Sequence, residues 1–267
     1  WRGAAVGVAM SFDIDVTVRL GEAVVGVVVP DDGRDSGLTV LFGPSGVGKS
    51  SVLNMVAGKL QQDTGSVSIA GKNVTKMADY SRAKYIGRVF QDPMAGTAPT
   101  MSIEENMALA YARGRFRGLG LGVGSKRREL FVEELKSLEL GLEGRLKTKV
   151  GLLSGGQRQA LSLLMATFSK PKILLLDEHT AALDPQRAAL VSRLTKEIVE
   201  RHQLTTLMVT HNMEQALQLG TRLIMMHDGQ IILDLNQEEK SRMTVQDLLD
   251  EFSKIKGAQL DDKTMLQ

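Results

Sequence analysis

Alternating and uniformly apolar stretches along this chain predict its strands. Apolar and polar residues alternate over residues 11–19, and an apolar run follows over 24–29, with Gly21 between them. This pattern predicts two antiparallel strands joined by a turn near Gly21. Residues 65–70 alternate in the same way and predict a further edge hairpin. Two apolar stretches joined by Asp228-Gly229 predict a closing hairpin.

A second group of segments has the pattern of a parallel sheet covered by helices. Residues 38–42, 172–176 and 206–209 are almost continuously apolar, which is typical of strands buried on both faces. A helix predicted over Pro185 to His202 separates the last two, as in a βαβ unit. Residues 93–169 have mainly helical spacing. We therefore expect an α/β fold with a mainly parallel core sheet, an antiparallel β-subdomain and an inserted helical subdomain.

Composition narrows the classes of protein that this pattern fits. Hydrophobic residues make up 43% of the chain but aromatic residues only 4%, so the core is expected to be aliphatic. The chain has no cysteine, which excludes a disulfide framework and a cysteine-based zinc site. The net charge of +2 gives no reason to expect a nucleic-acid partner. The longest apolar runs are much shorter than the ~18 residues that cross a bilayer.

A glycine-rich motif lies between the predicted strand 38–42 and a predicted helix at 50–57. It reads Gly43-Pro44-Ser45-Gly46-Val47-Gly48-Lys49-Ser50 and fits the phosphate-loop pattern G-x-x-x-x-G-K-[ST]. The backbone N–H groups of such a loop and the N-terminus of the helix attract phosphates. Lys49 is expected to contact the β- and γ-phosphates, and the Ser50 hydroxyl to bind Mg²⁺. The predicted nucleotide-binding residues of this segment are Gly43, Pro44, Ser45, Gly46, Val47, Gly48, Lys49, Ser50 and Ser51. The alternative, a glycine-rich turn beside a solvated lysine, does not account for the flanking strand and helix.

Two carboxylates follow the apolar strand 172–176, at the end where open α/β sheets bind ligands. Asp177 is expected to hold Mg²⁺, and Glu178 to act as the base that polarises an attacking water. An acidic pair in this position is by itself more typical of a helix N-cap or a solvated edge. The phosphate loop earlier in the chain favours the catalytic interpretation.

Four further segments carry a family resemblance. Leu153-Ser154-Gly155-Gly156-Gln157-Arg158-Gln159 resembles the signature motif of ABC ATPases. Gln91 resembles the Q-loop of that family, Ala182-Leu183-Asp184 its D-loop, and His211 its switch histidine. The resemblance covers residues 38–235, with the motifs in family order.

The resemblance implies ATP hydrolysis coupled to transport. Gln91 would contact Mg²⁺ and the attacking water, and His211 the γ-phosphate. Two chains would pack head to tail as a homodimer in the ATP-bound state. The signature residues and the D-loop residue of one chain would then meet the nucleotide held by the other. These predicted residues are Ser154, Gly155, Gly156, Gln157 and Asp184. The structural alternatives are that Ser154 is a plain helix N-cap and that residues 210–212 cap the next helix.

The resemblance also implies partners and a location. An ATPase of this kind would bind integral membrane permease subunits at the cytoplasmic face of the cell membrane and act indirectly with a solute-binding protein. Residues from about 86 onward resemble ATPases of putative tryptophan- or tyrosine-type importers, whereas residues 10–58 resemble the molybdate importer ATPase. Alternatives are a soluble ABC ATPase that acts on ribosomes or DNA, and a nucleotide-dependent module without catalysis.

The sequence departs from the family pattern at two positions. The N-terminal hairpin offers no aromatic residue for adenine stacking after Phe12, so weaker base selectivity is expected. Residue 179 is His where importers commonly have Pro. A surface histidine is the expected interpretation, and the alternative is that His179 tunes the neighbouring Glu178 carboxylate.

A basic run in the helical segment has two interpretations. It is expected to be a solvated helix face, with anionic lipid headgroups or acidic permease loops as the alternative. Its members are Arg113, Arg115, Arg117, Lys126, Arg127 and Arg128.

The domain boundaries follow from these segments. Residues 1–9 are expected to precede a natural start at Met10, and residues 10–235 to form the ATPase domain. The helical subdomain is expected over about 92–167. Residues 236–267 are expected to form a tail with a short amphipathic helix at 245–252.

Overall fold

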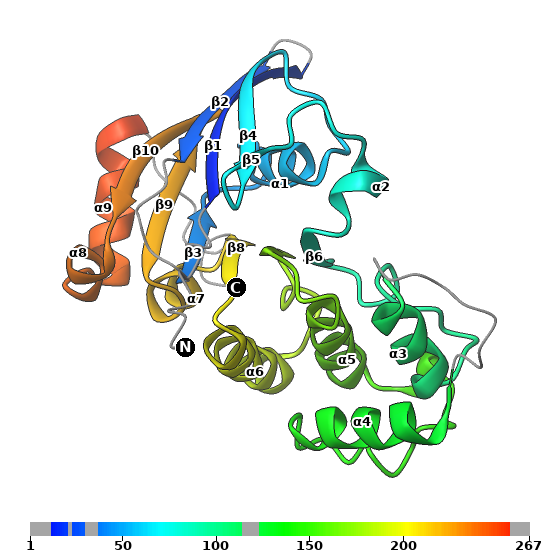
Figure 1. Ribbon diagram of the computed structural model, residues 1–267. Coiled ribbons are helices and arrows are strands. Elements are labelled where there is room, and N and C mark those ends of the chain that lie inside the picture. The colour runs from blue at the N-terminus through cyan, green and yellow to red at the C-terminus, as the bar shows by residue number, and fades with distance from the viewer. Residues whose placement is uncertain (1–11, 21–22, 30–36, 114–122, 257–267) are drawn as a thin grey trace, which may run out of the picture. The chain divides into compact units, whose positions relative to one another are not determined.

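The computed structural model describes residues 12–20, 23–29, 37–113 and 123–256 (Figure 1). The chain divides into two compact units. Unit 1 consists of the chain up to Arg82 and from His202 onward, and unit 2 of residues 83–201. The predictions about residues 1–9, the turn at Gly21, Arg115 and Arg117 lie outside the described residues. The same is true of the side chain of Phe12, so the adenine-stacking expectation stays a prediction.

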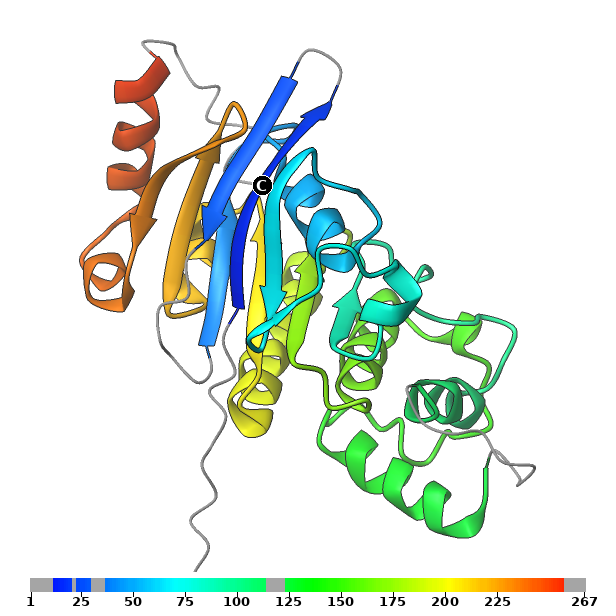
Figure 2. The same ribbon diagram turned by 45° about the horizontal axis from the view of Figure 1, so that its top comes forward.

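Unit 1 contains an antiparallel sheet in the order β2-β1-β4-β5. Figure 2 shows its three longer strands side by side. Their bounds are Phe12–Leu20 for β1, Ala23–Val29 for β2, Thr64–Ile69 for β4 and Lys72–Asn73 for β5. The two predicted N-terminal strands and the edge hairpin are therefore confirmed.

The second group of strands in unit 1 has the order β10-β9-β3-β8. β3 pairs in parallel with β8 and β9, whereas β9 and β10 form the predicted closing hairpin. Asp228 and Gly229 turn this hairpin with φ of 46° and 77°, as a tight two-residue turn requires. The bounds are Gly37–Phe42 for β3, Thr205–Thr210 for β8, Arg222–His227 for β9 and Gln230–Leu235 for β10. The mostly parallel pairing of this group and the separate antiparallel sheet agree with the predicted fold class.

Helix α1 (Lys49–Ala57) follows β3 through the glycine-rich motif. It ends at Gly58, whose φ of 78° suits the left-handed C-cap conformation. Arg82 is 2% exposed and donates hydrogen bonds to the carbonyls of Met55 and Val56 in the last turn of α1. A cation at a helix C-terminus is favourable for the helix dipole. Arg82 therefore completes the end of the helix that carries the phosphate-loop lysine.

The other helices of unit 1 are short except for the last one. Phe252 of α9 packs edge-on against Phe42 of β3, with ring centroids 5.8 Å apart. The bounds are Asp79–Arg82 for α2, Met213–Gln218 for α7, Gln237–Ser241 for α8 and Val245–Lys256 for α9.

Unit 2 combines a parallel strand pair with four α-helices among its described residues. Strands β6 (Ile86–Val89) and β7 (Ile173–Asp177) pair in parallel. Helix α5 packs on β6 and on α3, and Phe131 and Phe168 stack with centroids 6.0 Å apart. The helices are α3 (Ile103–Tyr111), α4 (Ser125–Lys136), α5 (Gly155–Thr167) and α6 (Pro185–His202), with a 3₁₀ turn at Val150–Leu152. The mainly helical character predicted for this part of the chain agrees with these elements.

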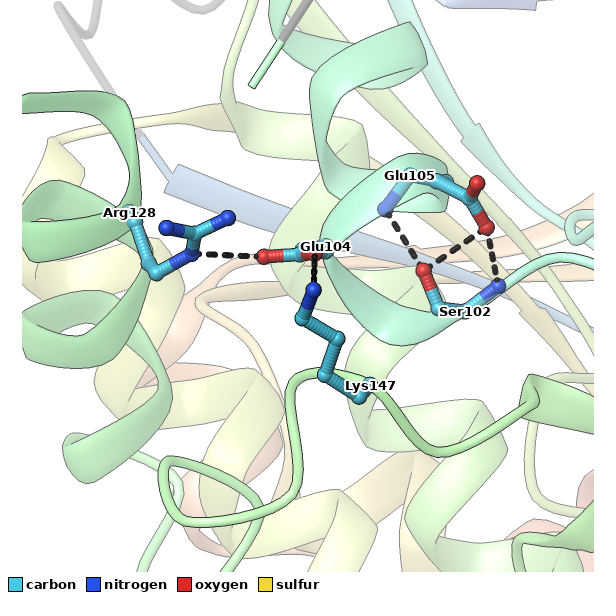
Figure 3. Close-up of polar contacts among 5 residues, drawn as sticks. All are labelled: Ser102, Glu104, Glu105, Arg128 and Lys147. Atoms are coloured by element: carbon cyan, nitrogen blue, oxygen red, sulfur yellow. Dashed lines mark hydrogen bonds and ion pairs between the residues drawn. The ribbon is translucent and has the colours of Figure 1, made fainter. Parts of the chain in front are cut away.

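Polar contacts hold the helical part of unit 2 together (Figure 3). Ser102 and Glu105 form a capping box at the start of α3. The carboxylate of Glu104, which is 6% exposed, accepts from Arg128 of α4 at 2.8 Å and lies 3.6 Å from Lys147. Arg128 in the basic run therefore serves an intramolecular ion pair, which neither predicted interpretation included. Arg127 lies over the Tyr111 ring, 5.7 Å from its centroid.

No helix within the described ranges has both the length and the apolar character of a bilayer span.

Candidate nucleotide-binding site

The phosphate-loop motif in unit 1 has a backbone that glycine alone adopts easily. Gly43, Gly46 and Gly48 have φ of 152°, 86° and 98°. A Cβ atom at Gly43 would lie 2.4 Å from the carbonyl oxygen of Met226, so no side chain fits there. Gly48 is the N-cap of α1, and glycine offers no side chain to cap the first turn. The loop therefore presents backbone N–H groups ahead of a helix N-terminus, which is the geometry of an anion site.

Lys49 is the first residue of α1 and is only 4% exposed. Its ammonium donates hydrogen bonds to the carbonyl of Gly43 and, at 2.8 Å, to the carbonyl of Pro44. The side chain thus folds back over its own loop. A lysine ammonium has three N–H donors on a rotatable bond. The same donors can therefore turn from the loop carbonyls to the oxygens of a phosphate bound in the loop.

His211 directly follows strand β8, and the phosphate loop directly follows β3 at the same end of these two parallel strands. The parallel register pairs Phe42 with Thr210, so Gly43 and His211 are the next residues of neighbouring strands. Asn212, not His211, caps α7, because its side chain accepts from the N–H of Gln215 at 2.8 Å. The capping alternative therefore applies to Asn212 and leaves His211 at the strand end.

Asp177 ends β7 and Glu178 follows it, and Gln91 comes after β6 at the same end of the strand pair in unit 2. The register pairs Val89 with Leu176, so Gln91 and Glu178 each lie two residues beyond this pair. Asp177 forms an ion pair with Arg88, whose Nη2 lies 2.9 Å from its Oδ2. Both side chains are largely buried, with exposed fractions of 11% for Arg88 and 16% for Asp177.

Ser154 is the N-cap of α5, as its structural interpretation predicted. Its Oγ accepts from the N–H of Gln157 at 3.3 Å, while the Gln157 Oε1 accepts from the N–H of Ser154 at 3.2 Å. This capping box does not use the N–H groups of Gly155 and Gly156. The signature motif continues into Gln159, which is fully buried and donates to the carbonyl of Phe90 at 3.0 Å. The signature helix is thereby fixed to the residue before Gln91.

The signature and the predicted D-loop lie side by side in unit 2. A Cβ atom at Gly155 would lie 3.3 Å from the Leu183 side chain, and one at Gly156 would lie 3.2 Å from that of Arg187. Asp184 accepts from the N–H of Arg187 at 3.1 Å, three residues along, as an N-cap of α6 does. The two motifs therefore form one surface.

His179 is not the surface histidine that the sequence suggested. It is 1% exposed, and its Nε2 lies 2.8 Å from the Oγ1 of Thr195 in α6. Burial lowers its pKa to about 4, because desolvation disfavours the charged imidazolium. The prediction of a surface position was wrong because a histidine that follows two carboxylates is typical of an exposed polar loop. Nothing in the sequence alone marked Thr195 as its partner.

The structure thus groups the predicted residues by unit. Unit 1 holds residues 43–51 and His211, whereas unit 2 holds Gln91, Asp177, Glu178, Asp184 and residues 154–157. Sequence reasoning missed the ion pair of Arg88 with Asp177. An arginine inside the apolar strand 86–89 was the available signal, because a buried guanidinium needs a partner.

The predicted metal ligands offer oxygen donors. Ser50 supplies a hydroxyl, Asp177 a carboxylate and Gln91 an amide, which suit a hard cation such as Mg²⁺. In the described ranges no three histidine or carboxylate side chains gather into a metal cluster. Each of these side chains is chemically suited to Mg²⁺; Ser50 belongs to unit 1, and Gln91 and Asp177 belong to unit 2.

Comparison with known proteins agrees with these motifs. The ABC transporter family profile matches residues 34–181. The chain is 43% identical over 221 residues to the tyrosine transport ATP-binding protein of Clostridioides difficile, covering 83% of this chain and 88% of that protein. It is 35% identical over 224 residues to the phosphonates import ATP-binding protein of Frankia casuarinae, covering 82% and 87%. A solved dimeric ATP-binding cassette in a post-hydrolysis state, bound to ADP and Pi, is 29% identical with a TM-score of 0.70, covering 85% of this chain and 98% of that one.

Proposed function

This chain belongs to the ABC transporter family as an ATP-binding and ATP-hydrolysing subunit, and on that premise we propose that it powers the import of an amino acid or a related small molecule. The phosphate loop carries this proposal. Its three glycines with positive φ, together with the folded-back Lys49, support binding of the phosphates of a nucleoside triphosphate.

Hydrolysis is assigned to the residues that follow β6 and β7 in unit 2, and to His211, which would contact the γ-phosphate. Glu178 accepts a proton from the water that attacks the γ-phosphate, and Gln91 orients that water. Lys49 stabilises the charge on the β- and γ-phosphates. Mg²⁺, when bound, neutralises phosphate charge, and Ser50, Gln91 and Asp177 would hold it. Arg88 keeps the Asp177 carboxylate oriented through the 2.9 Å ion pair.

The second half of the site is proposed to come from another copy of the chain. Ser154, Gly155 and Gly156 would face the nucleotide of the partner, with Asp184 beside them. The support is the single surface that the signature and D-loop form in unit 2, and the N–H groups of Gly155 and Gly156 that the capping box does not use. The structural relative described above is a dimer.

A depression of about 350 Å³ in unit 2 is the proposed contact for a permease subunit. It lies between residues 95–98 and helices α3 and α5. Residues 95–98 come shortly after Gln91 in the sequence. Asn106 fixes its wall by accepting from the N–H of Ala98 at 2.7 Å and donating to the Ala98 carbonyl at 3.0 Å. Leu109 at its rim is 50% exposed and would bury against an apolar permease side chain.

An aspartate scan of two exposed leucines tests this contact. Leu109→Asp should prevent reconstitution with the cognate permease while the ATPase rate of the isolated subunit stays unchanged. Leu130→Asp is the matched control, because Leu130 is 37% exposed on α4 and outside the depression. Equal reconstitution of both variants would move the permease contact elsewhere.

The first candidate for the cargo is tyrosine or a related amino acid, and its support is the 43% identity to the tyrosine transport ATP-binding protein. The resemblance of residues 10–58 to molybdate importer ATPases stays a prediction. Reconstituting the chain with a candidate permease and solute-binding protein, and measuring ATP-dependent uptake of tyrosine against molybdate, separates the two. Uptake of molybdate alone would overturn the amino-acid assignment.

The catalytic assignment has its own test. Glu178→Gln should bind MgATP normally, hydrolyse it at a rate lower by at least about a hundredfold, and accumulate as a dimer with ATP. Equilibrium nucleotide titration, phosphate release and size-exclusion chromatography measure the three properties. Turnover at the wild-type rate would remove Glu178 from the mechanism.

A further inference from the structure

The loop that carries Glu178 has an anchor inside unit 2. Glu178 has a φ of 44°, a left-handed conformation that a residue with a side chain adopts only at a cost. The next residue, His179, points its imidazole into the core and contacts Thr195 in the middle of α6. Thr195 itself is fully buried. A strained backbone beside a buried polar pair suggests that the pair holds the conformation.

The direction of the hydrogen bond can be determined. The Oγ1 of Thr195 donates its single hydrogen to the carbonyl of Val191 at 2.8 Å, one turn earlier in α6. Thr195 can therefore only accept from His179, so the imidazole Nε2 carries a proton. The three groups form a chain from the imidazole through the hydroxyl to the helix backbone.

We propose that His179 and Thr195 are positioning residues that fix the Glu178 carboxylate where it accepts a proton from the water that attacks ATP. This inference rests on the proposed role of Glu178 as the base. His179 shares a peptide plane with Glu178, so tethering its ring to α6 limits rotation of that plane. The carbonyl of Glu178 also accepts from the N–H of Ala181 at 2.9 Å, which closes the turn on the other side. Held at both ends, the Glu178 side chain keeps one direction.

Proline, which is common at this position in the family, would restrict the same loop through its ring. Here a hydrogen bond to α6 takes over that task. The bond joins the start of the loop to a point about 15 Å along α6 from Pro185, at 1.5 Å per residue.

Thr195→Val and Thr195→Ser form the decisive pair of variants. Valine keeps the shape of threonine but removes the acceptor, whereas serine keeps the hydroxyl. Thr195→Val should lower kcat for ATP hydrolysis on the order of tenfold with ATP affinity unchanged, because a misplaced base affects chemistry and not binding. Thr195→Ser should stay near the wild-type rate.

Variants of His179 provide an independent route if Thr195→Val does not fold. His179→Leu should show the same loss of kcat, and His179→Gln should restore much of it, because the glutamine amide can donate to Thr195. The His179→Leu and Thr195→Val effects should not add when combined, because each breaks the same bond. Additive losses with equal changes in ATP affinity would show ordinary core packing and overturn the proposal.

Glu178→Gln separates this inference from the proposed function. In that background Thr195→Val should have no further effect on kcat, because the base it positions is absent. If Glu178→Gln is inactive but Thr195→Val matches Thr195→Ser, only the positioning role fails. If Glu178→Gln is fully active, the proposed base itself is wrong.

Discussion

Two loop-to-helix junctions in this protein begin alike and are completed in opposite ways. The phosphate loop enters α1 through Gly48, which has no side chain for capping. The signature enters α5 through Ser154, which forms a full capping box with Gln157. The N-terminus of α1 thus has no side-chain cap, whereas that of α5 is capped by its own serine.

The difference bears on what each junction does alone. The phosphate loop has glycine geometry and the buried donors of Lys49, so we expect it to bind nucleotide within a single chain. The signature instead begins with a complete capping box, and its half-buried Gly155 and buried Gly156 lie beside the side chains of Leu183 and Arg187, next to the D-loop. This agrees with the role proposed for it above, in which it meets a nucleotide that another chain holds.

Removing Lys49 tests whether the phosphate loop binds nucleotide within a single chain, and it should have the largest effect. Lys49→Ala should weaken ATP binding by about a hundredfold or more, because charge-assisted bonds to phosphate are lost. Isothermal titration calorimetry of the monomer measures this change. Lys59→Ala, on the exposed lysine just beyond α1, is the control and should bind like the wild type. Normal binding by Lys49→Ala would place the nucleotide elsewhere.

The signature half is tested by blocking its face. In the Glu178→Gln background, Ser154→Arg should abolish ATP-dependent dimers while each monomer still binds ATP. The matched control is Ser102→Arg, since Ser102 forms the same capping box on α3 of the same unit. Analytical ultracentrifugation with and without ATP measures dimer formation. Loss of ATP binding in the Ser154→Arg monomer would make Ser154 a residue of the same chain's site.

Low pH tests the buried His179, which anchors the Glu178 loop in unit 2. The pKa of His179 is lowered by burial to about 4, from 6.5 in the unfolded chain. Between these values the unfolded chain binds a proton that the folded one does not, so stability falls as the pH drops from about 6.5 to 4. The contribution is roughly 3 kcal/mol. Chemical denaturation at pH 7 and pH 4.5 should show a smaller decrease for His179→Gln than for the wild type.

The smallest effect concerns the cap alone. Ser154→Ala should lower the free energy of unfolding by about 1 kcal/mol, and Ser102→Ala by a similar amount, because both break a capping box. Urea unfolding measures both. A much larger loss for Ser154→Ala would mean that the signature serine has a structural role beyond its cap.

Local patterns were enough to predict much of this structure. The bounds of α6 and the turn at Asp228-Gly229 were predicted correctly, because helical spacing and turn chemistry are local properties. The phosphate loop was predicted for the same reason. Glycine, lysine and serine at fixed spacing between a strand and a helix specify its shape.

The contacts that required tertiary pairing were not predicted. The ion pair of Arg88 with Asp177 joins residues far apart in sequence, and the burial of His179 depends on Thr195 in another element. The Glu104–Arg128 pair likewise changed the interpretation of the basic run. A single sequence gives the type of each residue but not the partner that the fold brings to it.

The clamp of Arg82 on α1 has a consequence for the order of events during synthesis. The last turn of α1 obtains its arginine only after the whole segment through residue 82 has left the ribosome. Strand β3 waits longer, because β8 and β9, its two neighbours, come after unit 2 in the chain. Unit 2 is continuous in sequence and is translated completely before them. Since domains generally fold as units during translation, the signature half is expected to form while the phosphate-loop half is still unfinished on the nascent chain.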